Sequence, residues 1–71
     1  MDNYSVEFRC FSKYDDHTPL MHIPKERTNL SAESISDART KFYHLDMIVN
    51  TVKNGGHCVI IDVFKVESSD E

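Results

Sequence analysis

The segment His57–Val66 constrains the fold most, because it is apolar on both sides of an extended chain. Side chains alternate between the two faces of a strand. One face would carry Val59, Ile61 and Val63, and the other Cys58, Ile60, Phe64 and Val66. A strand that is apolar on both faces needs cover on both. The pattern therefore predicts a strand that is central in its sheet or covered by another chain.

Residues 4–14 show the alternation of a half-buried strand. The apolar face carries Tyr4, Val6, Phe8 and Cys10, and the polar face carries Ser5, Glu7, Arg9 and Lys13. Phe11 interrupts the polar face and needs cover. Residues 15–19 are typical of a turn or loop. Residues 20–23 are predicted to be extended as far as Pro24, and extended structure is expected to resume near Thr28 and Leu30.

An apolar stripe at helical spacing follows. Its members are Ile35, Ala38, Phe42, Leu45, Ile48, Val49 and Val52. Ser31 and Ser34 compete as the N-cap, and Ser34 is favoured because Asp37 then occupies the acidic position of a capping box. Asn54, Gly55 and Gly56 are expected to end the helix with a left-handed cap. One helix of about 20 residues would span about 30 Å.

These elements predict an α+β domain in the order β-β-α-β, with a small three-stranded, mainly antiparallel sheet and one long helix packed on one face. Residues 1–71 are expected to form a single domain, with residues 1–3 and 67–71 frayed. The other face of the sheet would keep Phe11 and one row of the last strand. A second copy of the chain is the simplest cover for that face.

The composition excludes several classes of function. The net charge is −4 and the eight Lys and Arg are scattered along the chain, so direct nucleic-acid binding is not expected. No apolar run approaches the ~20 residues that span a bilayer, and no signal peptide begins the sequence. A cytoplasmic protein with no membrane contact is therefore expected. Cys10 and Cys58 are expected to be reduced thiols, with a disulfide only in an oxidising compartment.

No motif predicts a catalytic or metal site. The sequence has no Cys-x-x-Cys pair and no His-x-x-x-His pair. The cluster Asp15-Asp16-His17 is explained equally well by a solvated turn. Asp62 interrupts the apolar last strand, where solvent contact, a backbone cap or an ion pair accounts for it better than catalysis. We therefore expect a protein that is not an enzyme and that has no cofactor.

Two surfaces are candidates for binding a partner. Tyr43 and Met47 are four residues apart on the polar side of the predicted helix, near Arg39 and Asn50. Aromatic residues and Met are enriched at interfaces, although single exposed apolar residues are also normal. Phe11 marks the second surface, the uncovered face of the sheet. Charged contacts are expected from Asp15, Asp16 and Asp46.

The C-terminal half, from NLSAESISDARTKF to GGHCVIIDVFKV, resembles in general style the small αβ proteins carried by bacteriophages and prophages, among them anti-CRISPR proteins. The resemblance implies a bacterial host cytoplasm and an inhibitor that blocks a host protein surface, such as that of a nucleic-acid-binding complex. The leading hypothesis is accordingly a non-enzymatic protein-binding module. The alternatives are a homodimeric structural or regulatory subunit that buries the open sheet face, and, third, a small metal- or thiol-dependent enzyme.

Overall fold

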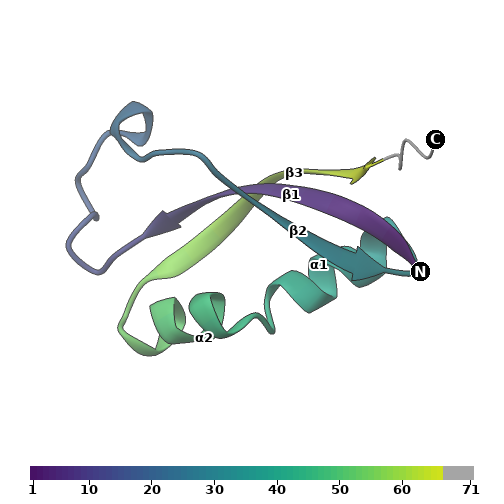
Figure 1. Cartoon of the computed structure of the whole chain (residues 1–71). Helices are drawn as coiled ribbons and strands as arrows, with labels where there is room; N and C mark the ends of the chain where they lie inside the picture. The colour runs from purple at the N-terminus through teal and green to yellow at the C-terminus, as the bar shows by residue number, and fades with distance from the viewer. Residues whose placement is uncertain (67–71) are drawn as a thin grey trace.

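The computed structural model describes residues 1–66, and the elements follow one another as three strands and two α-helices with a 3₁₀ turn (Figure 1). They are β1 (Asp2–Phe11), η1 (Leu20–His22), β2 (Glu26–Ala32), α1 (Ile35–Phe42), α2 (Asp46–Lys53) and β3 (His57–Val66). The predicted α+β class and three-stranded antiparallel sheet are confirmed. Residues 67–71, which were expected to fray, lie outside the described residues.

β1 is the central strand of the sheet, whose order is β2-β1-β3. Both neighbours run antiparallel to β1. β3 lies at an edge, so a central position, the first of the two predicted alternatives for His57–Val66, is wrong, while cover by another chain stays a prediction. β1 begins at Asp2, two residues before the predicted start, where Asp2 pairs with Ala32. Its central position explains why Val6 and Phe8 are almost fully buried.

A β-bulge in β3 changes which of its side chains share a face. Glu7 pairs with Asp62, but Phe8 pairs with Ile60, so Ile61 is an extra residue. An extra residue reverses the alternation beyond it. The inward-facing side chains that are buried or half-buried are Cys58, Ile60 and Val63, and the exposed outward-facing apolar ones are Val59, Ile61, Phe64 and Val66. The division of faces expected from strict alternation is thus wrong for Val63, Phe64 and Val66.

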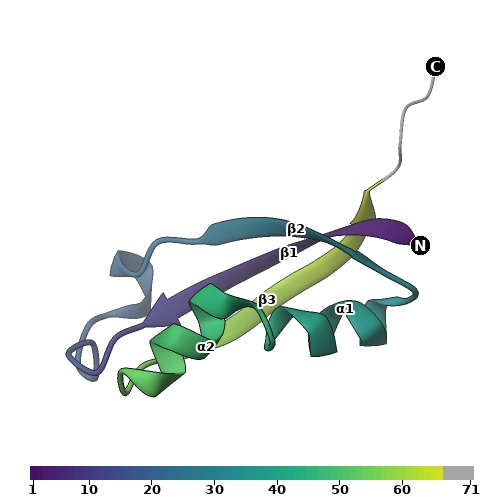
Figure 2. The same cartoon turned by 60° about the horizontal axis from the view of Figure 1, so that its bottom comes forward.

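Two helices stand where one long helix was predicted. Ser34 caps α1, and its Oγ accepts a hydrogen bond from the Asp37 backbone N–H at 3.0 Å, which confirms the favoured N-cap. The helix ends after Phe42, and Leu45 has an extended backbone, with φ −66° and ψ 140°. Residues 43–45 contain neither Pro nor Gly, so no helix-breaking residue type marks the interruption in the sequence. The two helices lie one after the other on the same side of the sheet (Figure 2).

The connections differ in how well local patterns predicted them. Residues 20–23 do not form a strand, because Leu20–His22 is a 3₁₀ turn. At the end of α2, Gly55 has a φ of 88°, as expected for a left-handed cap. Gly56 lies against the Phe11 carbonyl, where a Cβ atom would collide with that oxygen. These two glycines allow the chain to turn from α2 into β3.

The core lies between the sheet and the two helices. Phe8 and Phe42 meet edge to face with ring centroids 4.9 Å apart, and Ile48 of α2 is almost fully buried. Cys10 of β1 and Cys58 of β3 pair directly and form a disulfide. The expectation of reduced thiols is therefore wrong. No helix within residues 1–66 is long and apolar enough to cross a membrane.

Candidate functional site

The face of the sheet turned away from the helices, which we call the outer face, carries a row of exposed apolar side chains along β3. This β3 row consists of Val59, Ile61, Phe64 and Val66, with exposed fractions between 37% and 48%. The row exists because the bulge at Ile61 turns Phe64 and Val66 to the same face as Val59. Contiguous apolar surface of this kind marks interaction sites in soluble proteins.

Beside the β3 row, the outer face is polar. Arg27 of β2 donates to the carboxylate of Glu7, its partner on β1, at 2.6 Å. This hydrogen bond is the main reason that the pKa of Glu7 lies below its ordinary value. The Arg27 guanidinium also lies over the Phe64 ring, 5.4 Å from its centroid. The pair therefore fixes the boundary between the polar and apolar halves of the outer face.

Ser5 occupies the middle of this boundary, paired with Phe64 on one side and Asn29 on the other. Its side chain is only 2% exposed in relative terms. The Ser5 hydroxyl has no hydrogen-bond partner among the described residues. A buried hydroxyl without a hydrogen-bond partner is unfavourable. The centre of the outer face therefore holds one polar group that no described residue pairs with.

A small hollow lies at the Val59 end of the β3 row. It has a volume of about 290 Å³ and is lined by Arg9, Phe11, Leu20, Val59 and Ile61. The Arg9 Nε atom donates to the Ile23 carbonyl oxygen at 3.2 Å, which ties the β1–β2 connection to the sheet. The Phe11 ring stacks on His57 at 4.8 Å. The hollow thus has almost entirely apolar walls.

Phe11 is the one predicted site residue in this hollow, on the uncovered face where it was expected. The neighbouring contributions of Arg9 and Leu20 were missed. Arg9 was assigned only to a polar strand face, and Leu20 to a strand that is not present. The one available signal was that Phe11 and Arg9 occur on the same face of the predicted first strand, two residues apart.

The other predicted site residues lie on the helices, which cover the opposite face of the sheet. Tyr43 caps the C-terminal end of α1, whereas Met47 lies in the first turn of α2, so the helical spacing between them is interrupted. Both are about half exposed, and Arg39 and Asn50 are exposed as well. These four side chains and Phe11 do not form one site.

The predicted charged contacts have different surroundings. The Asp15 carboxylate accepts hydrogen bonds from the Ser12 N–H at 2.9 Å and from the hydroxyls of Ser12 and Thr18 at 3.0 Å. These bonds lower the pKa of Asp15, chiefly through the backbone of Ser12. Asp15 therefore holds its own loop together. Asp16 and Asp46 are exposed.

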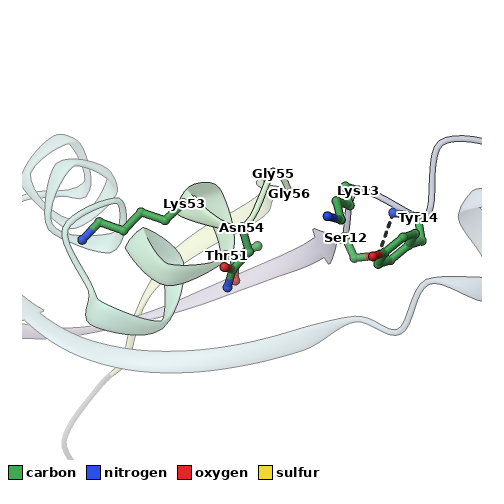
Figure 3. A pocket seen from close by; sticks show the side chains of 8 residues that line it. All are labelled: Ser12, Lys13, Tyr14, Thr51, Lys53, Asn54, Gly55 and Gly56. Carbon is green, nitrogen blue, oxygen red and sulfur yellow. Dashed lines mark hydrogen bonds between the residues drawn. The ribbon is translucent and has the colours of Figure 1, made fainter.

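A second, shallower hollow lies between the end of β1 and the end of α2 (Figure 3). Its lining consists of Ser12, Lys13, Tyr14, Thr51, Lys53, Asn54, Gly55 and Gly56. Lys53 extends away from the Ser12–Tyr14 side of the hollow (Figure 3). The N–H groups of Gly55 and Gly56 donate to the Val52 and Thr51 carbonyls. These two backbone N–H groups are therefore not available to a ligand in the hollow.

Chemistry-bearing groups do not converge elsewhere in the part of the chain that the structure describes. No three His, Cys, Asp or Glu side chains of residues 1–66 are placed to hold a metal ion. Cys10 and Cys58 are bonded to each other, so neither is a free thiol in this state. The Asp62 carboxylate accepts the Val63 N–H at 2.9 Å, next to the bulge. No protein-family model, curated protein or solved structure matches this chain.

Proposed function

We propose that the chain is a non-enzymatic module that binds another protein through the outer face of its sheet. The observation that carries the proposal is the β3 row, in which four apolar side chains stay exposed along an edge strand. Apolar anchors at an interface supply most of its binding energy. The edge of β3 adds backbone donors and acceptors that can pair with an extended segment of the partner.

The helix side is the weaker of the two candidate surfaces. Tyr43 packs edge to face on the buried Phe42 ring, with centroids 5.1 Å apart, and so contributes to covering the core. The Met47 carbonyl is engaged by the Thr51 hydroxyl at 2.9 Å. Exposed side chains on two separate helices are compatible with an ordinary solvated surface. The helix side therefore serves as the comparison for testing the outer face.

The test is affinity capture from lysate of the source organism with three forms of the tagged protein. The outer-face variant carries Val59→Lys and Ile61→Lys, and the matched control carries Tyr43→Ala and Met47→Ala, at similarly exposed positions. We expect the outer-face variant to lose the captured protein by at least about tenfold, since hot-spot residues contribute 2 kcal/mol or more. The control should retain it.

Loss in the control variant with retention in the outer-face variant would refute the proposed surface. The mass of the purified protein in solution then identifies the class of partner. A dimer that becomes monomeric in the outer-face variant would show that the partner is a second copy of the chain. If the unmodified protein and the outer-face variant are both monomeric, the partner is a different protein.

A further inference from the structure

We infer that the β3 edge binds an extended segment of a different protein, in which one Lys or Arg lies between two apolar side chains at alternate positions. This inference rests on the proposed function and specifies which partner the outer face recognises. The observation behind it is the carboxylate of Asp62, which lies between Ile61 and Phe64 of the β3 row. A charge among apolar contacts allows an interface to distinguish one partner from another.

Asp62 lies on the outer face together with the β3 row. It pairs directly with Glu7 of β1, and directly paired residues place their side chains on the same face. Glu7 is on the outer face because Arg27, which donates to its carboxylate, also lies over the Phe64 ring. The bulge therefore places Ile61 and Asp62 next to each other on one face, an apolar contact beside a charge.

Asp62 is not paired with a cation among the described residues. The ion pairs within residues 1–66 are Arg27–Glu7, Lys41–Asp37 and Lys65–Asp2. Lys65 is the only Lys or Arg in β3, and it is held by Asp2. Like charges directly opposite each other destabilise a sheet, and Asp62 lies opposite Glu7. A cation supplied by a partner would therefore form an ion pair and also reduce this repulsion.

The position of β3 in the sheet determines the form of the bound segment. β3 is an edge strand, so the side away from β1 can pair with the backbone of another chain. A strand added there would place every second side chain on the outer face. With its cation beside Asp62, the outward side chains two positions before and after would lie beside Val59 and Phe64. Both of these neighbours are apolar, which gives the recognised pattern of apolar, cationic and apolar side chains.

A second copy of the chain does not supply this pattern. None of the eight Lys and Arg has an apolar residue two positions away on both sides. Self-pairing through the β3 row would also bring a second Asp62 carboxylate into the interface, and like charges oppose association. The net charge of −4 instead favours a partner that is basic at the contact.

The test is a titration of ¹⁵N-labelled protein, followed by amide chemical shifts, with three peptides at millimolar concentration. The first is acetyl-Thr-Val-Thr-Lys-Thr-Val-Thr-amide. In the second, Gln replaces Lys, and in the third, acetyl-Thr-Val-Lys-Thr-Thr-Val-Thr-amide, the Lys is moved by one position to the other face of the strand. We expect the first peptide to shift the amides of Ile61, Asp62 and Phe64, and to bind about threefold more tightly than the other two, as for one cross-strand ion pair.

Asp62→Asn should bring the ratio of the Lys and Gln affinities close to one. Glu33→Gln removes the same charge from an exposed position after β2 and should leave the ratio unchanged. Equal binding of the three peptides, an unchanged ratio in Asp62→Asn, or no shifts along β3 would overturn the inference. A dimer that Val59→Lys with Ile61→Lys dissociates would also overturn it, because a second copy would then cover the row. Loss of the Lys preference with intact capture of a partner would refute this inference alone, so the two proposals are separable.

Discussion

Both faces of the sheet are partly apolar, but only the inner face is covered by the helices. On the inner face, Val6, Phe8 and Phe42 are almost fully buried between the sheet and the helices. On the outer face, the β3 row keeps 37% to 48% of its surface exposed. The same residue types thus stabilise the fold on one side and remain available for binding on the other.

This difference shows that a single strand, β3, supplies both core residues and the exposed apolar row. Cys58, Ile60 and Val63 face the core, while Val59, Ile61, Phe64 and Val66 point outward. Burial supplies stability in proportion to the apolar area removed from water. Substitutions on the inner face should therefore unfold the protein, and substitutions on the outer face should mainly change what it binds.

The largest expected effect is the contrast between two phenylalanines. Phe42→Ala should lower the free energy of unfolding by about 4 kcal/mol, because it opens a cavity in the core. Phe64→Ala should lower it by only about 1 kcal/mol, because much of that ring is already in water. Urea denaturation of the two variants measures both values. Similar losses for both would mean that the outer face is part of the core.

Removal of the disulfide is expected to have the next-largest effect on the free energy of unfolding. Cys10→Ser with Cys58→Ser should lower the free energy of unfolding by about 3 kcal/mol, because the bond closes a long loop in the unfolded chain. The two cysteines are 48 positions apart in the sequence. A reductant should have the same effect on the wild-type protein and none on the double variant. An unchanged urea midpoint on reduction would contradict the bond's contribution.

Substitution of Ser5 is expected to change the free energy of unfolding by less, and to raise it. Its hydroxyl is buried on the outer face without a partner in the described residues, so Ser5→Ala should raise the free energy of unfolding by about 1 kcal/mol. Thermal and urea unfolding would measure the gain. A loss of stability instead would show that the hydroxyl is hydrogen-bonded in solution, and that the outer face is better satisfied than the structure indicates.

The smallest effect is the dependence of stability on acid. The pKa values of Glu7 and Asp37 lie below their ordinary values of 4.5 and 3.8 in the folded protein. Their stabilisation is therefore present above those values and is lost as the pH falls through the lower folded pKa values. Unfolding measured between pH 6 and about pH 2 should show this decline.

Added salt should weaken the stabilisation from these two carboxylates to different extents. The hydrogen bond from Arg27 is the main reason that the pKa of Glu7 is lowered. The hydrogen bond from the backbone N–H of Glu33 is the main reason that the pKa of Asp37 is lowered. Salt screens exposed ion pairs, so it should reduce the effect of Glu7→Gln more than that of Asp37→Asn. The opposite ranking would contradict these assigned causes.

Local patterns predicted the features that depend on neighbouring residues. The limits of the last strand, the Ser34 cap and the left-handed cap at Gly55 follow from spacing and backbone preference. The order of the strands does not, because His57–Val66 is apolar enough for a central position. Its outer face is instead left exposed at an edge, which no local rule indicates.

The remaining differences arise from contacts between distant segments. The apolar spacing continues from Phe42 to Leu45 and Ile48, so it does not indicate that the helix is interrupted at residues 43–45. Cys10 and Cys58 meet because β1 and β3 pair in one particular register. For the candidate site, Phe11 was predicted on the open face beside Arg9, but Leu20 joins them only through the position of η1.

The bulge at Ile61 has a consequence for how such a chain can evolve. Deletion of this one residue would remove the bulge and keep the observed faces, because Ile60 and Asp62 would then be consecutive. If the strand instead paired without the bulge at its present length, Phe64 and Val66 would turn toward the helices and Val63 toward solvent. Exchanges among Val, Ile and Leu in β3 would leave the arrangement intact. In descendants of this chain, selection should therefore act on the pairing register of β3 with β1 more strictly than on the identity of its apolar residues.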